Sequence, residues 1–161
     1  MLVDQLIKYF VYETKGHITK TQLVKFIYLA DLYAVKWTGK QLTDLDWCYY
    51  HYGPWNEEID RALARMEGVD IFQEQMNEAT LIRPLSLEKI GKDLDFPMGL
   101  RLILNNIKRE WAGSKKIQPL LDYVYSTAPM TEVKKDNPDP EAKVRLDLKK
   151  EREKLLCELG V

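Results

Sequence analysis

The longest apolar pattern in the chain runs from Leu23 to Trp37. Apolar residues recur there at the spacing of one helical face, and a second set widens this stripe until little of the circumference is polar. The first set is Leu23, Phe26, Ile27, Ala30, Tyr33, Ala34 and Trp37, and the second is Val24, Tyr28, Leu32 and Val35. Thr19 and Gln22 have the spacing of a capping box, and Gly39 suits a left-handed C-terminal cap. The pattern predicts a helix that starts near Lys20 and lies buried at the centre of a domain.

A shorter helical stripe precedes this one. Its apolar residues predict a helix over about residues 2–15 that ends at Gly16, and they are Leu2, Leu6, Ile7, Phe10 and Val11. The tight turn at residues 15–18 resembles the start of a helix-turn-helix. Helices in any bundle are joined by loops this short, however, and no basic recognition face accompanies the turn. We therefore favour ordinary packing of this helix on the central one.

An aromatic segment follows the central helix. Residues 46–52 are too aromatic and too short for a good helix, so we expect extended chain there. Gly53 and Pro54 then suit the N-cap and the first position of a new helix, with Glu57 and Glu58 in its first turn. Its single apolar face consists of Ile59, Ala62, Leu63 and Met66, and Gly68 ends it.

The order of these features resembles a known family. A KLxKLxYLAD-like helix, followed by a Gly, a Leu and an aromatic-Gly-Pro turn, is typical of the Panacea domain, the family of antitoxin SocA-like proteins. The matching positions are Leu23, Lys25, Tyr28, Leu29, Ala30, Asp31, Gly39, Leu42, Tyr52, Gly53 and Pro54. The resemblance is good over about residues 1–67. It implies a helical domain that neutralises a partner toxin, and the toxins paired with such domains are of varied kinds.

After residue 68 the pattern changes character. Residues 69–73 and 80–83 favour strands, and Asn77 and Glu78 between them predict a small hairpin. If this hairpin packs against the aromatic segment, the two form a minor sheet. A charged linker follows, and then two helices are predicted. The apolar positions are Leu100, Ile103, Leu104, Ile107 and Trp111 in the first helix, and Ile117, Leu120, Leu121 and Val124 in the second.

These elements predict two regions. Residues 1–133 should form one mainly α domain around the buried central helix, with a small antiparallel β-hairpin or minor sheet at its side. Residues 134–140 then read as a polar loop. The segment from Glu141 to Leu159 is expected to be a charge-rich helix that packs on the domain or on a partner, and its apolar positions are Val144, Leu148, Leu155, Leu156 and Leu159.

Composition narrows the class of protein. The 161 residues are 45% hydrophobic and 30% charged, which fits one ordinary domain that needs no disulfide or metal to fold. A formal net charge of −1 creates no overall attraction to nucleic acid or to anionic membranes. We find neither a signal peptide nor a transmembrane run, and Cys48 and Cys157 lack a CxxC context. We therefore expect a cytoplasmic protein with reduced thiols.

The residue types that carry catalysis form no recognised motif. His17 and His51 have no partners at metal-ligand spacing, so we expect no metal and no cofactor. Asp31, His51 and Glu57 could converge as an acid/base cluster, yet Asp31 more simply pairs with a Lys or caps a backbone group. Lys25 should run its stem along the core and keep its amine at the surface. We expect that the protein is not an enzyme.

The aromatic segment is the best candidate for a function beyond structure. Alternation along a strand directs Tyr49 and Tyr50 to opposite faces, so some of these rings should lie at the surface. Exposed Tyr and Trp anchor protein interfaces, and we assign partner binding to Tyr49, Tyr50, His51 and Trp55. The other interpretation is that helices and the hairpin cover both faces. The remaining family-motif residues should be mostly structural.

The leading hypothesis follows from the resemblance. It implies a cytoplasmic antitoxin-like module that neutralises a cognate protein toxin by forming a protein complex. A protease or DNA as a further partner stays open, as do the toxin's identity and the oligomeric state. The alternative is a nucleic-acid-binding regulator whose N-terminal part is winged-helix-like, with the hairpin as the wing. An enzyme is the third interpretation, and it would need a polar pocket.

Overall fold

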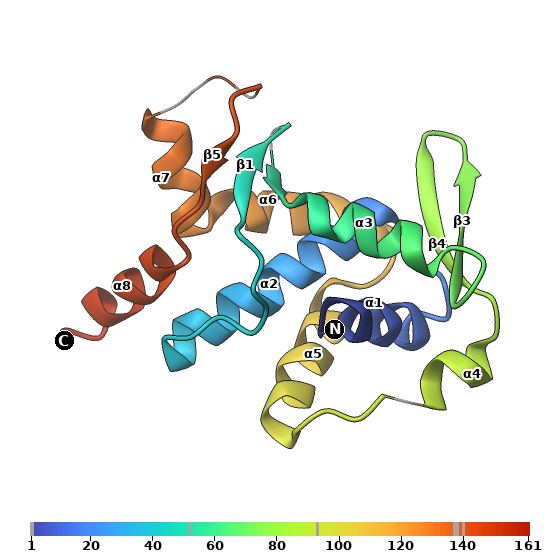
Figure 1. Cartoon of the computed structure of the whole chain (residues 1–161). Coiled ribbons are helices and arrows are strands. Elements are labelled where there is room, and N and C mark those ends of the chain that lie inside the picture. The colour runs from blue at the N-terminus through green and yellow to red at the C-terminus, as the bar shows by residue number, and fades with distance from the viewer. Residues whose placement is uncertain (1, 52, 93, 137–138, 140) are drawn as a thin grey trace.

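The fold is arranged around α2, Lys20–Thr38. The computed structural model describes residues 2–51, 53–92, 94–136, 139 and 141–161. The predicted capping box is present, since Gln22 N–H donates to Thr19 Oγ1 at 3.1 Å and Thr19 N–H donates to the Gln22 side chain at 3.0 Å. Gly39 caps the other end with φ of 83°. In Figure 1, α2 crosses the middle of the molecule and other elements cover it on several sides.

Four helices supply most of the packing around α2. One precedes α2 in the chain and three follow it. They are α1 (Leu2–Glu13), α5 (Met98–Trp111), α6 (Ile117–Ser126) and α8 (Lys149–Glu158). The first three present the apolar faces that the sequence predicts, with residues such as Phe10, Leu104 and Val124 fully buried. A short 3-10 turn, Ser114–Lys116, leads into α6. The resulting mainly α domain confirms the predicted fold class.

Helix α8 attaches to the domain by polar contacts as well as by apolar ones. Glu151 is buried, and its carboxylate accepts a 3.0 Å hydrogen bond from Ala128 N–H at the start of α7, Ala128–Asp136. Arg152 donates at 3.0 Å to the carbonyl of Lys36 in the last turn of α2. Such a cation at a helix C-terminus satisfies a free carbonyl and favours the helix dipole. These contacts fix α8 against α2 and α7.

In the part of the chain that the structure describes, two small antiparallel sheets lie on the sides of the helical core. The first sheet has the strand order β2-β1-β5. Its strands are β2 (Gly53–Trp55), β1 (Cys48–Tyr50) and β5 (Val144–Arg145). The second is the predicted hairpin, β3, Ile71–Met76, and β4, Ala79–Pro84, whose turn holds Asn77 at φ of 56°. Figure 1 shows the hairpin at the far side of α3 from β1. The hairpin and the aromatic segment therefore belong to separate sheets.

Several predicted boundaries are wrong. Helix α3, Glu57–Met66, begins three residues after Pro54, because Gly53 and Pro54 belong to strand β2 and Asn56 is the N-cap, with its side chain accepting from Glu58 N–H at 2.8 Å. The charged linker contains a helix, α4, Leu87–Lys92. The helix expected from Glu141 starts only at Lys149, because β5 pairs with β1 before it. Helix α7 was not predicted.

Helix length and polarity bear on membrane insertion. Among the residues that the structure describes, no helix is both long and apolar enough to span a membrane.

Candidate functional site

Asp31 organises the loop that follows α2. It is fully buried, and its carboxylate accepts hydrogen bonds from Leu42 N–H at 3.1 Å, Thr43 N–H at 2.9 Å, Thr43 Oγ1 at 2.5 Å and Trp47 Nε1 at 2.8 Å. Burial raises the pKa of Asp31, and these hydrogen bonds act in the opposite direction. All the contacts of this carboxylate are inside the protein, so Asp31 holds the 42–47 loop in place and is not offered to a substrate.

Lys25 has a more buried side chain than the sequence predicts. Only 8% of the residue is exposed, and a methyl group added to Gly53 would lie 3.4 Å from Lys25 Nζ. The ring of Tyr125 in α6 lies close to the same point. Burial lowers the pKa of Lys25 from 10.5 to about 8. The expectation of an amine at the surface is wrong, because the end of the side chain lies close to β2 and the residue is buried.

The other family-motif residues lie in the core or form turns. Leu23, Tyr28 and Leu29 are fully buried on α2, and the Tyr28 hydroxyl shares a 2.9 Å hydrogen bond with Thr127. Gly39 adopts the left-handed conformation that its cap position requires. Gly53 and Pro54 occur in β2, and Gly53 is not in the left-handed region. Tyr52 lies outside the described residues.

The aromatic segment alternates between core and surface. Trp47 and Tyr49 point into the core, whereas Tyr50 and Trp55 are partly exposed and His51 is exposed. Tyr50 and Trp55 meet edge to face with ring centroids 5.3 Å apart, and the ring centroids of His51 and Tyr50 are 3.8 Å apart. We call Tyr50, His51 and Trp55 the aromatic surface. Of the four residues assigned to partner binding, the structure brings these three together and buries Tyr49.

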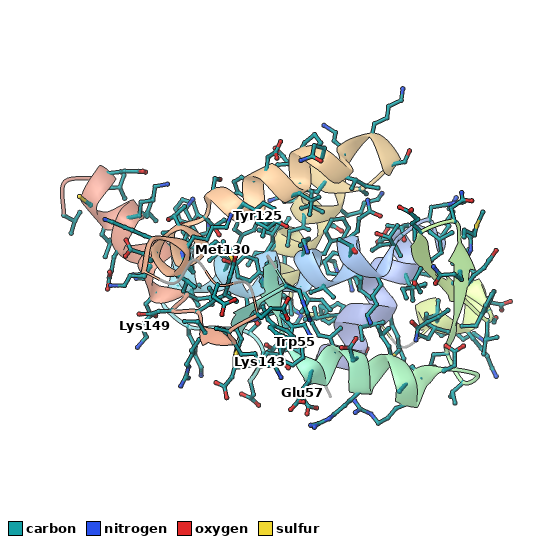
Figure 2. The ribbon with its side chains drawn as sticks, turned by 90° about the horizontal axis from the view of Figure 1, so that it is seen from above. Trp55, Glu57, Tyr125, Met130, Lys143 and Lys149 are labelled. Carbon is teal, nitrogen blue, oxygen red and sulfur yellow. The ribbon has the colours of Figure 1, made fainter. Side chains whose placement is uncertain are left out.

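A residue from the C-terminal part covers the aromatic surface. Lys143 Nζ lies 5.0 Å from the ring centroid of Tyr50 and 4.7 Å from that of Trp55, within the range of a cation–π contact with each ring. Figure 2 shows Lys143 and Trp55 together on one side of the molecule. The sequence carries no local signal for this contact, because the two residues are joined only through the pairing of β5 with β1.

A second exposed apolar feature lies between α2 and α5. Trp37 is 62% exposed, although its place on the apolar stripe predicts burial. It borders a groove of about 330 Å³ whose lining residues are Tyr33, Lys36, Trp37, Leu102, Ile103, Asn106 and Tyr123. The hydroxyl of Tyr33 donates to that of Tyr123 at 3.3 Å on one wall. We call this feature the Trp37 groove. The helical period could not locate it, because almost every face of α2 is apolar.

The three residues considered for acid/base chemistry do not converge. Asp31 is engaged with the loop after α2, His51 Nδ1 lies 3.7 Å from the carboxylate of Glu141, and Glu57 pairs with Arg61 at 3.2 Å. Within the described ranges, no three His, Cys, Asp or Glu side chains gather as a metal site.

Comparison with known protein families agrees with the features around α2. A model of the family described as "Antitoxin SocA-like, Panacea domain" matches the chain from residue 23 to residue 95. We call residues 23–95 the Panacea segment. The resemblance expected from the α2 motif and the aromatic-Gly-Pro turn is thereby confirmed. No curated protein and no solved structure matches the chain.

The Panacea match covers the elements from α2 to α4. It includes the whole aromatic surface and Trp37, whereas Lys143 and the α5 wall of the Trp37 groove lie outside it. The match also leaves out α1, α5, α6 and α8, which pack against α2. The Panacea segment therefore supplies the central helix, and the rest of the chain supplies most of its packing.

Proposed function

We propose that the protein is an antitoxin: a cytoplasmic, non-enzymatic module that binds a cognate protein toxin and neutralises it within the complex. The observation that carries this proposal is the match of residues 23–95 to the SocA-like antitoxin family. The match suggests an antitoxin role, and complex formation is the mechanism that an exposed binding surface supports. The identity of the toxin is left to experiment.

The aromatic surface is the proposed docking site for the toxin. Tyr and Trp side chains give a large contact area at low entropic cost, and they are enriched at the centres of protein interfaces. Tyr50 and Trp55 are held against each other by the short β1–β2 pairing, so their rings are already positioned. A preformed contact loses less conformational entropy on binding than a mobile one.

A pull-down from the native host tests the proposal. The tagged chain is purified with nuclease treatment, and proteins that co-purify in stoichiometric amounts are identified by mass spectrometry. Each candidate is then expressed alone and together with this chain. A protein that stops growth when expressed alone, and is harmless when co-expressed, supports the proposal. Absence of any such protein among the stoichiometric partners contradicts it.

The nucleic-acid-binding alternative makes a different prediction for the same experiment. Binding to DNA through basic side chains would retain nucleic acid when nuclease is omitted, and the affinity would fall steeply with salt. Two basic residues near the hairpin and α3 are already paired with carboxylates, since Lys20 lies 2.5 Å from Asp60 and Lys8 lies 3.7 Å from Asp70. These ion pairs reduce the positive charge that Lys8 and Lys20 offer to the phosphate groups of a nucleic acid.

A further inference from the structure

The aromatic surface already holds a cation. Lys143 Nζ lies over both Tyr50 and Trp55, and the two rings meet edge to face, so they form two walls around the ammonium group. A cation over an aromatic face is attracted by the negative charge of the ring, and the attraction grows when water is excluded. The structure therefore displays the kind of group that this surface accepts.

The segment that carries Lys143 is attached by contacts that another chain can replace. Strand β5 forms two residue pairs with β1, Arg145 with Cys48 and Val144 with Tyr49. The ion pairs beside it join exposed groups, Arg145 with Asp46 at 3.1 Å and Glu141 with His51 at 3.7 Å. Exposed ion pairs are screened by water and salt, so each contributes little.

Val144 is half-buried and packs against the core, and the attachment becomes firmer after residue 145. Leu146 and Leu148 are buried, and Leu146 N–H donates at 2.8 Å to the carbonyl of Trp47. Helix α8 then packs on α2. Residues 141–145 can consequently leave the edge of β1 while Leu146, Leu148 and α8 stay in place. A free strand edge is a ready template for a strand from another chain.

The charges near the aromatic surface favour a basic occupant. Asp46 precedes β1, and Glu57 and Glu58 follow Trp55 in the first turn of α3. Figure 2 shows Glu57 on the same side of the molecule as Trp55 and Lys143. When Arg145 leaves, Asp46 loses its ion-pair partner, whereas Glu57 and Glu58 stay paired with Arg61. The freed Asp46 carboxylate attracts a lysine or arginine side chain and repels a phosphate group, which argues against stacking on nucleic acid.

We infer that Tyr50 and Trp55 bind a lysine or arginine side chain on an extended segment of the toxin, and that residues 141–145 of this chain occupy the same site in the free protein. The toxin segment pairs with the edge of β1, as β5 does, and its cation replaces Lys143 between the rings. The identity of the occupant rests on the proposed function, whereas the exchange of the segment can be tested without a toxin.

The probe is a fluorescein-labelled peptide with the sequence of residues 139–147, and binding is measured by fluorescence anisotropy. It is titrated with the full wild-type chain and with Lys143→Ala/Arg145→Ala, which weakens the resident segment. A third protein adds Trp55→Leu to that pair of changes. The matched control is Lys149→Ala/Lys154→Ala, which removes two exposed positive charges from α8. Circular dichroism verifies that all four proteins are folded.

The peptide should bind Lys143→Ala/Arg145→Ala at least tenfold more tightly than it binds the wild type or the α8 control. Adding Trp55→Leu, or replacing the lysine of the peptide by alanine, should weaken binding at least tenfold. Equal affinity for the wild type and the Lys143→Ala/Arg145→Ala chain overturns the inference. So does binding that is unaffected by Trp55→Leu or by the alanine peptide.

This outcome is separable from that of the pull-down. A toxin that is captured while the peptide shows none of these differences leaves the antitoxin proposal standing and removes the inference. Peptide exchange without any captured toxin supports the inference and contradicts the antitoxin proposal. The strand edge then binds a cation from another kind of protein.

Discussion

The indole N–H of Trp47 donates a 2.8 Å hydrogen bond to the carboxylate of Asp31, sixteen residues earlier in the chain. Both residues are buried, and Trp47 also packs edge to face on Tyr28 with centroids 5.4 Å apart. One carboxylate thus ties the loop at residues 42–47 and the start of β1 to the central helix. The aromatic surface depends on this link, because β1 begins immediately after Trp47.

Replacing Asp31 by alanine should therefore destabilise the whole fold. The change leaves four hydrogen-bond donors without their acceptor, three of them buried, and we expect the free energy of unfolding to fall by about 3 to 5 kcal/mol. Urea unfolding followed by tryptophan fluorescence measures it. The exposed Asp44→Ala is the matched control and should change the value by less than about 0.5 kcal/mol. Similar losses in the two variants would contradict the role given to Asp31.

Gly16 and Gly99 should respond in opposite directions to alanine. Gly16 has φ of 79°, and an added methyl group would lie 2.7 Å from Pro84 Cδ, so Gly16→Ala should lower the free energy of unfolding by about 2 to 4 kcal/mol. Gly99 lies on the exposed side of α5 with nothing within 4 Å, so Gly99→Ala should raise it by about 0.5 to 1 kcal/mol. Thermal unfolding of both variants tests the pair. A stable Gly16→Ala protein would show that the turn between α1 and α2 can move away from β4.

The buried amine of Lys25 should make stability rise with pH. Its pKa is about 8 in the folded protein and 10.5 ordinarily, so between these values the unfolded chain holds a proton that the folded chain has lost. The free energy of unfolding should increase by about 2 kcal/mol from pH 8 to pH 9.5. Urea titrations at several pH values should show this slope in the wild type and in the exposed-site control Lys40→Met, and not in Lys25→Met.

The measurement should stop below pH 10. Burial raises the pKa of Tyr9 to about 12 and raises that of Tyr28 further, so above pH 10 the unfolded chain loses these protons first and stability falls. At pH 7, Lys25→Met should be more stable than the wild type by about 1 to 3 kcal/mol, since an apolar side chain replaces a buried charge. An unchanged pH slope in Lys25→Met would mean that another group causes it.

Two tryptophan variants distinguish the candidate surfaces for the toxin. Trp55→Ala removes one wall of the aromatic surface, and we expect the dissociation constant of the toxin complex to rise at least tenfold. Trp37→Ala makes the same chemical change in the Trp37 groove and should have less than a threefold effect. Isothermal titration calorimetry with the purified toxin measures both. The opposite ranking would place the interface at the groove between α2 and α5.

The parts of the fold that depend on local signals could be predicted from the sequence. The capping box at Thr19, the left-handed cap at Gly39 and the hairpin turn at Asn77 are each specified within a few residues, and all three are present. The start of α3 was misplaced because Gly53 and Pro54 carry a strong helix-start signal. Asn56 supplies the cap instead, since strand pairing of β2 with β1 takes up Gly53 and Pro54.

The candidate site was predictable only in part. Alternation along β1 correctly separates Tyr49 from Tyr50, because the side-chain period of a strand is a local property. The position of Lys143 depends on β5, a strand of two residues that has no independent tendency to form and is created by its pairing with β1. The exposure of Trp37 depends on which side of α2 the other helices leave uncovered, and the apolar pattern does not mark that side. Neither feature leaves a trace in the neighbouring sequence.

The way α2 is enclosed by both ends of the chain also determines how the protein folds. Helix α1 precedes α2 directly, but Tyr28 finds its hydrogen-bond partner 99 residues away and the Lys36 carbonyl finds its partner 116 residues away. Such contacts form only after a long loop has closed, which slows folding relative to bundles of sequential neighbours. Until α6 and α8 arrive, the most apolar helix of the protein stays uncovered. The early folding species should therefore be prone to aggregation and a natural client of chaperones.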